Sequence, residues 1–167
     1  MKKLLGLISL LLLFHISYGQ ENNNTELFFI RHAEKVRSGS KDPALTKIGQ
    51  ERAIYWAEVF KDVKFDAVYS TQTLRTVSTA LPTSGQCDVE LSIYDAKTID
   101  IKAIADKHKG ESVLIVGHSN TTPALVNTLI GEEKYEEIKS NNNSNLYIVN
   151  YHTENSKVTL LHIDLPK

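Results

Sequence analysis

Two short apolar runs, each ending next to a histidine, restrict the fold of this chain more than any other feature. Residues 28–30 (Phe-Phe-Ile) lead directly into Arg31 and His32, and residues 113–116 (Val-Leu-Ile-Val) lead through a glycine into His118. A short, near-continuous apolar run is typical of a strand buried on both faces of a parallel sheet. Because ligands of open α/β sheets bind just beyond the carboxyl ends of the strands, both histidines are expected in a ligand crevice.

Strand and helix patterns alternate along the rest of the chain. We expect strands at 25–31, 65–70, 89–93 and 112–116, and helices at 46–60, 73–81, 98–109 and 122–131. The first helix has an apolar stripe of Ile48, Ala53, Trp56, Ala57 and Phe60, and Pro82 is expected to stop the second helix. Residues 146–151 and 158–163 pair as a closing hairpin. The predicted fold is an α/β three-layer sandwich with a mostly parallel central sheet and this hairpin at its C-terminus.

The first 19 residues have the layout of a secretory signal peptide. Two lysines follow Met1, residues 4–14 are apolar, and Ser17 and Gly19 are small residues at the −3 and −1 positions of a cleavage site. An uncleaved membrane anchor is the alternative, but the apolar stretch is short for a span of about 20 residues. We expect cleavage near Gly19, export to the periplasm or the medium, a polar leader at 20–24 and a single domain at 25–167.

Composition excludes several classes of partner. The formal net charge is −1 and no basic stripe is present, so nucleic acid is not an expected partner. The single Cys87 excludes an internal disulfide, and we interpret it as a free, partly buried thiol. After cleavage no membrane contact is expected, and the sequence leaves the oligomeric state open.

Four motifs appear in order along the chain. They are Arg31-His32, the helix start Leu45-Thr46-x-x-Gly49-x-x-x-Ala53, Arg75 followed by Thr79-Ala80, and Gly117-His118. Each of them is weak alone, but together, in this secondary-structure context, they resemble the histidine phosphatase superfamily, also called phosphoglycerate mutase-like. The resemblance covers nearly all of the chain after the leader, and the length is similar to the short branch without a cap domain.

The resemblance implies a role for each motif residue. His32 would be the nucleophile that becomes phosphohistidine, and His118 would contact the phosphoryl group. Arg31 and Arg75 would complete the phosphate pocket together with His118. The implied substrate is a small phosphorylated compound or a phosphoprotein, and the implied reaction is hydrolysis of phosphomonoesters or phosphoramidates.

The chemistry of the residues agrees with these roles. Phosphoryl transfer depends mainly on positioning and on stabilising the charge of the equatorial oxygens, which arginine guanidinium groups do with paired hydrogen bonds. A nucleophilic histidine must be neutral, so we expect an acceptor on the other ring nitrogen of His32 to fix its tautomer. No cofactor is expected, and the two histidines lack the spacing of a zinc motif.

The general acid that protonates the leaving group is left open. The mutase-like branch uses a glutamate in a context that is missing here, and phytase-like members use an aspartate where this chain has Ser119. Asp95 is the first candidate, with a turn or helix cap as its alternative role. Glu34 is the second candidate, and it could instead pair with Lys35 or Arg37.

Three other functions agree with parts of this sequence. A catalytically impaired domain that binds phosphate or a phosphorylated ligand is the main alternative, since the acid of the family is missing. A serine hydrolase with Ser119 as nucleophile is disfavoured because Thr121 fills the last glycine position of the elbow motif. A mutase is disfavoured because an export signal does not suit a cytosolic substrate. The loops at 36–42 and 84–97 are expected to set specificity.

Overall fold

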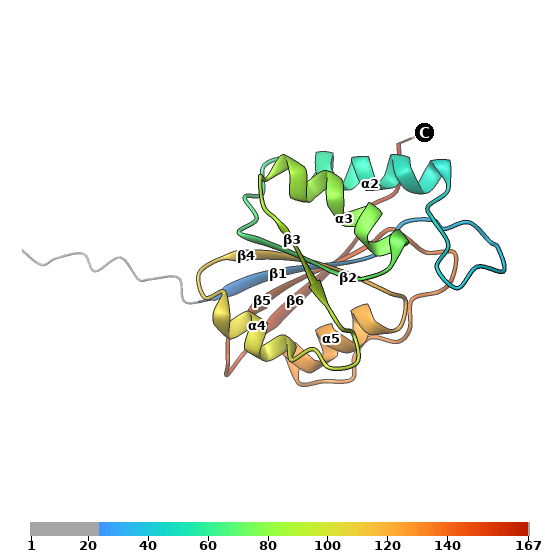
Figure 1. Cartoon of the computed structure of the whole chain (residues 1–167). Coiled ribbons are helices and arrows are strands. Elements are labelled where there is room, and N and C mark those ends of the chain that lie inside the picture. Colours follow the sequence, from blue (N-terminus) through green and yellow to red (C-terminus); the bar gives the residue numbers. More distant parts are fainter. Residues whose placement is uncertain (1–23, 167) are drawn as a thin grey trace, which may run out of the picture.

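A six-stranded sheet forms the middle layer of the protein, and helices cover both of its faces (Figure 1). The computed structural model describes residues 24–166, so the predicted signal peptide and almost all of the polar leader lie outside the described residues. The strands are β1 (Thr25–Arg31), β2 (Ala67–Thr71), β3 (Leu91–Tyr94), β4 (Ser112–Gly117), β5 (Asn145–Tyr151) and β6 (Lys157–His162). Their order in the sheet is β3-β2-β4-β1-β5-β6.

Four of the six strands are parallel. β3, β2, β4 and β1 pair in parallel, β5 pairs antiparallel with β1, and β6 pairs antiparallel with β5. Helices α2 (Lys47–Val59) and α3 (Leu74–Gln86) lie on one face, and α4 (Ile101–Lys107) and α5 (Thr121–Ile130) lie on the other (Figure 1). The predicted three-layer sandwich with a mostly parallel sheet and a closing hairpin is confirmed.

The first strand is buried on both faces, as its composition predicts. Leu27 and Phe29 pack on the side of α4 and α5, whereas Phe28 and Ile30 pack on the side of α2 and α3. None of these four side chains is more than 5% exposed. Two separate apolar cores therefore fix β1 at the centre of the sheet, and its carboxyl end is held rigidly.

The helix α3 does not stop at Pro82, and this part of the prediction was wrong. Proline removes one backbone N–H but leaves the residues that follow it free to stay helical if other contacts hold them. Here Gln86, in the last turn, donates from its side-chain Nε2 to the Ala57 carbonyl of α2 at 3.0 Å, and Thr83 and Ser84 are buried. Tertiary contacts thus keep the last turn in place.

The helix α4 begins three residues later than predicted. The Asp95 carbonyl accepts hydrogen bonds from the backbone N–H groups of Thr98 and Ile99, which form a separate turn. Asp100 then caps the helix, because its Oδ1 accepts a hydrogen bond from the Ala103 N–H at 3.0 Å.

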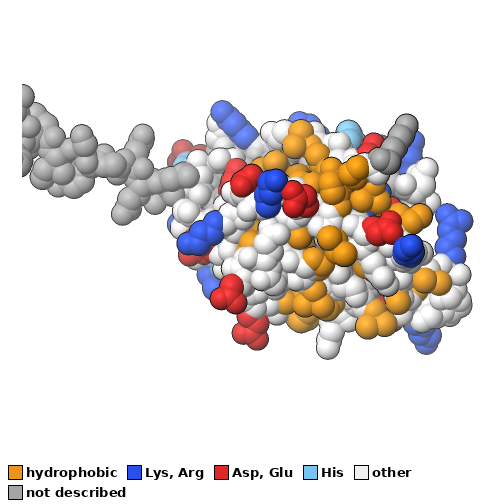
Figure 2. Space-filling model, turned by 90° about the horizontal axis from the view of Figure 1, so that it is seen from above, with side chains coloured by type: hydrophobic (Ala, Val, Ile, Leu, Met, Phe, Trp, Pro, Cys, Tyr) orange, Lys and Arg blue, Asp and Glu red, His pale blue; other side chains and the backbone are white. Residues whose placement is uncertain are grey.

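The outer side of α2 and α3 carries hydrophobic side chains among charged ones (Figure 2). Ile48 belongs to the predicted buried stripe but is 56% exposed, and Ile54 is 64% exposed. Arg52 is buried instead, since it makes an ion pair beneath the helix. Within the described part of the chain, no helix combines the length and the apolar character that a bilayer span requires.

The start of α2 is fixed to the segment that follows the first histidine. Thr46 donates its N–H to the Glu34 carbonyl at 2.8 Å, and its side chain caps the helix by accepting the Gly49 N–H at 3.0 Å. A Cβ atom at position 49 would collide with the Glu34 carbonyl oxygen. The close backbone packing that a glycine in the first helical turn predicts is therefore present, and it anchors the chain just beyond His32.

Candidate active site

The carboxyl edge of the sheet brings the four predicted residues together. Arg31 ends β1, His32 follows it, His118 follows β4, and Arg75 lies in the first turn of α3. All four line one open cavity of about 440 Å³, and the remaining lining residues are Lys35, Ala96, Lys97, Ser119, Asn120 and Thr121. The ring centroids of the two histidines are 5.6 Å apart. The crevice expected beyond these strands is thus present, with both histidines and both arginines in it.

His32 is held as a neutral imidazole with one nitrogen free. Its Nδ1 lies 2.7 Å from the Ala33 carbonyl oxygen, which can only accept, so Nδ1 carries the proton. Nε2 then has a lone pair, and no hydrogen bond to it occurs within the described residues. Burial lowers the pKa of His32 to about 4, and the positive charges of Arg31 and Arg75 act in the same direction. At neutral pH the ring is therefore neutral, its tautomer is fixed, and Nε2 carries a free lone pair.

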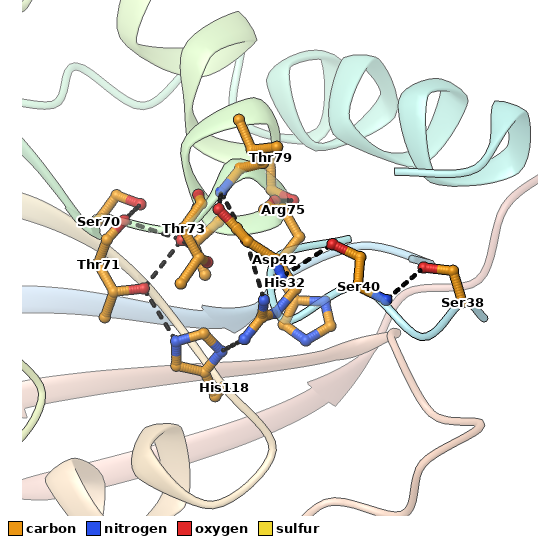
Figure 3. A network of polar contacts seen from close by, with 12 residues as sticks. His32, Ser38, Ser40, Asp42, Ser70, Thr71, Thr73, Arg75, Thr79 and His118 are labelled. Carbon is orange, nitrogen blue, oxygen red and sulfur yellow. Dashed lines mark hydrogen bonds and ion pairs between the residues drawn. The ribbon is translucent and has the colours of Figure 1, made fainter. Parts of the chain in front are cut away.

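His118 lies between Thr71 and Arg75 (Figure 3). Its Nδ1 is 3.4 Å from Arg75 Nη2, and since a guanidinium only donates, Nδ1 is an acceptor. Its Nε2 is 2.9 Å from Thr71 Oγ1, to which it donates its proton. Burial lowers the pKa of His118 to about 4, with Arg75 and Arg31 as the next causes. The second histidine is thus also neutral, and it is fixed from both sides.

The guanidinium of Arg31 is anchored by the backbone of a distant loop. Its Nη1 donates to the carbonyl oxygens of Lys139 and Asn142, each at 2.9 Å, and to that of Ser140 at 3.3 Å. The residue is only 6% exposed, and its Nε is buried without a partner. Burial lowers the pKa of Arg31, but an arginine stays charged in proteins. A fixed, partly unpaired cation at this position is suited to bind an oxyanion.

Arg75 is positioned by an aspartate from the loop before α2. Asp42 pairs with Arg75 Nη1 at 3.3 Å and also accepts the Leu74 N–H at 3.1 Å, so one carboxylate caps α3 and orients its arginine. The Arg75 Nε is buried without a partner. Thr79 accepts the Ala33 N–H at 2.9 Å and donates to the Arg75 carbonyl at 2.7 Å, which ties α3 to the residue after His32 (Figure 3).

The two acid candidates lie in different places. Glu34 receives Nε of Arg52 at 2.8 and 3.0 Å and Nη2 at 2.8 Å, and it does not line the cavity. The partner is Arg52, not Lys35 or Arg37 as considered from the sequence. Asp95 is exposed, and its Oδ1 accepts the Lys97 N–H at 2.9 Å. It lines a second cavity of about 380 Å³, which shares His118, Ala96 and Lys97 with the first.

Sequence reasoning missed the segment 137–143, which closes one side of the site. Asn143 Nδ2 donates to the His32 carbonyl at 2.8 Å, and Ser119 Oγ donates to Glu137 Oε1 at 2.8 Å. The three consecutive asparagines at 141–143 mark a loop, but nothing local in the sequence indicates that this loop folds back onto the first strand. Ser119 Oγ bonds a carboxylate, and within the described residues it has no hydrogen bond to a histidine, which a hydrolase nucleophile would require.

Metal ligands do not gather in the described part of the chain. No group of three or more His, Cys, Asp or Glu side chains there is arranged to hold a metal ion. The half-buried Cys87 lies apart from the cavity, with its Sγ 3.9 Å from the Val63 carbonyl. The groups that can act on a ligand in the cavity are therefore two imidazoles, two guanidinium groups and the polar residues around them.

Residues 27–96 match the family model described as "Histidine phosphatase superfamily (branch 1)". The resemblance to the histidine phosphatase superfamily is confirmed. The matched range contains Arg31, His32 and Arg75, and His118 lies beyond it. A comparison with curated protein sequences finds no match.

Several solved structures have the same fold as this chain. Bacillus stearothermophilus YhfR has a TM-score of 0.69 at 16% identity, with 84% of this chain and 98% of that chain covered. The protein histidine phosphatase SixA, complexed with tungstate, has a TM-score of 0.65 at 20% identity, with 82% and 96% covered.

Phosphoserine phosphatase from Entamoeba histolytica, in complex with 3-phosphoglyceric acid, has a TM-score of 0.66 at 16% identity, with 84% and 98% covered. At these identities the likeness shows the fold alone. Together with the family match, the site geometry supports a phosphatase activity.

Proposed function

We propose that this protein is a phosphatase that hydrolyses phosphomonoesters or phosphoramidates through a phosphohistidine on His32. One observation carries the proposal. His32 is buried, its Nδ1 proton is engaged by the Ala33 carbonyl, and its Nε2 is left without a partner in a cavity lined by two arginines. A nucleophile with its tautomer fixed and a cationic site for the transferred group are what phosphoryl transfer to histidine requires.

The reaction runs in two displacements. The Nε2 lone pair of His32 attacks phosphorus, the bond from phosphorus to the leaving oxygen or nitrogen breaks, and the leaving group takes a proton. Water then attacks phosphorus and gives a proton back to the acid that protonated the leaving group, the P–N bond breaks, and the electron pair returns to Nε2 as inorganic phosphate leaves. In both steps Arg31 and Arg75 bind the equatorial oxygens and stabilise their charge, and His118 adds a donor when its Nε2–H turns from Thr71 Oγ1 to a phosphoryl oxygen.

Charge stabilisation in this scheme comes from side chains, without a metal. Both arginines have a buried Nε with no partner, and buried donors without a partner are rare enough to need an explanation. A bound phosphate would complete the hydrogen bonding of these guanidinium groups. We therefore expect turnover to persist after dialysis against EDTA and to be inhibited by tungstate, a tetrahedral oxyanion like the one bound to SixA.

Asp95 is the proposed general acid, and Glu34 is disfavoured. A leaving group that extends from the phosphate past His118 would enter the second cavity, of which Asp95 is the lining carboxyl group. Glu34 is instead held as a carboxylate by Arg52. An acid matters most for a poor leaving group. Asp95→Asn should therefore slow an alkyl phosphate at least about tenfold and leave p-nitrophenyl phosphate nearly unchanged. Equal effects on both substrates would remove Asp95 from this role.

A phosphate-binding domain without turnover is the second candidate function. It is favoured by one observation, the absence of any Asp or Glu from the lining of the cavity that holds His32. Hydrolysis of p-nitrophenyl phosphate by the wild type and by His32→Ala separates the two functions. Turnover that needs His32, with ³²P trapped on its ring, supports the phosphatase. No turnover by either form, with phosphate still bound, supports the binding domain.

The place of action is proposed to be outside the cytoplasm. The proposal rests on residues 1–19, with their lysines, apolar stretch and small residues before position 20. The test is mass spectrometry of the N-terminus after expression of the full chain in a bacterial host. A mature N-terminus at Gln20 in the periplasm or medium supports export, and an intact Met1 in the cytoplasm contradicts it.

A further inference from the structure

The cavity around His32 contains more positive charge than one phosphate group needs. Its lining includes Arg31, Arg75, Lys35 and Lys97 and no carboxylate. The chain as a whole carries a net charge of −1, so this gathering of cations is local. Carboxylates beside the cavity have other partners: Asp42 pairs with Arg75, Glu137 accepts from Ser119, and Asp95, in the adjoining cavity, accepts the Lys97 backbone N–H.

The two lysines are supplied by separate segments, and neither belongs to the proposed phosphate pocket. Lys35 follows β1, where its backbone forms an isolated bridge with Leu45. Lys97 follows β3, where its N–H is held by Asp95 in a tight turn. Neither ammonium group has an ion-pair partner within residues 24–166. Lys35 also acts on the site electrostatically, because its charge contributes to the lowered pKa of His118.

Lys97 lies where the two cavities meet. Together with Ala96 and His118 it lines both the cavity around His32 and the adjoining cavity that Asp95 lines. A leaving group that passes His118 would pass this ammonium group. Lys35, in contrast, lines only the first cavity.

We propose that the substrate carries a second anionic group beside the phosphate that is cleaved, and that Lys35 and Lys97 bind this group. The inference rests on the proposed function, and it narrows the substrate class to small phosphorylated compounds with a carboxylate or a second phosphate. The arginines bind the transferred phosphoryl group, and the lysines bind the part of the substrate that leaves. Charge-assisted hydrogen bonds to a lysine are stronger than neutral ones, so they favour an acidic substrate over its neutral analogue.

Two phosphate esters of nearly the same shape test the proposal. Glycerol 3-phosphate and 3-phosphoglycerate carry the phosphate on the same kind of primary oxygen, and a carboxylate replaces a hydroxymethyl group in the second. We would measure kcat/KM for both with the wild type, with the double variant Lys35→Ala/Lys97→Ala, and with Lys102→Ala as control. Lys102 is an exposed lysine of α4 that does not line either cavity.

The wild type and the control should prefer the carboxylate compound by at least about tenfold, and the double variant should lose this preference. Turnover of p-nitrophenyl phosphate, which has no second anion, should fall much less in the double variant than turnover of the carboxylate compound, and it should be unchanged in Lys102→Ala. A second matched pair is 1,3-propanediol bisphosphate and 3-hydroxypropyl phosphate. Comparing kcat/KM for these two compounds shows whether a second phosphate can take the place of the carboxylate. Equal kcat/KM for the matched compounds in the wild type, or a preference that survives in the double variant, would overturn the proposal.

Binding separates this proposal from the phosphatase reaction. The same two esters would be titrated calorimetrically into His32→Ala, with and without the two lysine substitutions. If the protein has no turnover but binds 3-phosphoglycerate more tightly in a lysine-dependent way, the phosphatase proposal fails and the second anion site stands. If it turns over p-nitrophenyl phosphate and binds both esters equally, the phosphatase stands and the second anion site fails.

Discussion

Two buried histidines at opposite edges of the sheet differ in one respect that decides what each can do. His108, at the amino edge, has both ring nitrogens in hydrogen bonds, Nε2 with Tyr69 at 3.0 Å and Nδ1 with Glu111 at 2.6 Å. His32, at the carboxyl edge, has only Nδ1 in a hydrogen bond. The two residues are buried to nearly the same degree, since 7% of the surface of His108 and 3% of that of His32 is exposed. Burial therefore does not distinguish a structural histidine from a reactive one, but an unpaired nitrogen beside a cavity does.

The charged groups around the two rings also differ. A carboxylate faces His108, whereas His32 is surrounded by Arg31, Arg75 and the other histidine of the site. A carboxylate partner completes the hydrogen bonding of an imidazole inside the protein. Cations around a neutral imidazole instead favour an anionic ligand that would complete the site. Protein groups thus complete the hydrogen bonding of His108 at the amino edge, whereas His32 at the carboxyl edge keeps a free nitrogen beside a cavity.

The largest expected effect separates the two histidines by activity. His32→Ala should lower kcat for p-nitrophenyl phosphate by at least about 10³-fold, since removing a covalent nucleophile removes the reaction path. His108→Ala should leave kcat within about twofold at a temperature where it is folded. His152→Ala, an exposed histidine in the loop before β6, serves as a control. A similar fall in kcat for His32→Ala and His108→Ala would contradict the different roles proposed for the two histidines.

The second-largest loss of activity is expected when Arg31 or Arg75 is replaced. Arg31→Ala and Arg75→Ala should each lower kcat/KM about 10²-fold to 10³-fold, which is the typical loss for a donor that stabilises transition-state charge. Arg31→Lys should not restore activity, because the ammonium group lacks the planar fork with which Nη1 reaches three loop carbonyls. The measurement is steady-state kinetics beside a circular dichroism melt. Full activity of Arg31→Lys would show that only the charge matters.

Sequence reasoning found the first half of this site more easily than the second. Arg31, His32, Arg75 and His118 were predictable because each follows or flanks an apolar strand, and parallel strands end at one edge. Their partners were not, since Asp42 and Asn143 reach the site from loops whose path depends on tertiary packing. The segment 139–142, whose carbonyl groups hold Arg31, contributes only backbone atoms, and no residue type records that role.

The errors in the fold have the same origin. Pro82 stays inside α3 and Ile48 lies on the surface because neighbouring helices and an ion pair outweigh local propensity. Arg52 takes the buried place on α2 to reach Glu34, a contact between residues that lie 18 positions apart. A stripe of apolar residues predicts which face of a helix is buried, but it does not anticipate a charged side chain that is satisfied beneath the helix.

A pH dependence of stability should follow from the neutral rings. The pKa of His32 is about 4 in the folded protein and about 6.5 in an unfolded chain. Between these values the unfolded state binds the proton and the folded state does not, so the free energy of unfolding falls as pH falls. The free energy of unfolding, measured with urea, should therefore fall by about 1 to 2 kcal/mol less in His32→Ala than in the wild type when the pH is lowered from 7 to 5. Parallel curves would show that His32 is not held neutral by the fold.

The histidine at the amino edge should show its importance in stability. His108→Ala leaves the buried hydroxyl of Tyr69 without its 3.0 Å partner, and an unsatisfied buried polar group costs about 1 to 3 kcal/mol. We expect a loss of that size in the free energy of unfolding at pH 7. The double variant His108→Ala/Tyr69→Phe removes both partners and should recover part of the loss. A double variant that is less stable than the single one would mean that packing, not hydrogen bonding, holds this edge together.

The smallest effect should come from the loop that contacts the proposed nucleophile, His32. Asn143 Nδ2 donates to the His32 carbonyl at 2.8 Å and is 7% exposed, so Asn143→Ala leaves that carbonyl unpaired next to the reacting ring. We expect kcat to fall about fivefold to tenfold with KM nearly unchanged, because a net hydrogen bond contributes about 1 kcal/mol. Asn141→Ala, an exposed asparagine of the same run, is the matched control. A purely structural role would lower the melting temperature of Asn143→Ala and leave kcat of the folded fraction intact. A fall in kcat for the folded enzyme, absent in Asn141→Ala, would instead show that the carboxyl edge depends on this loop to aim Nε2 at phosphorus.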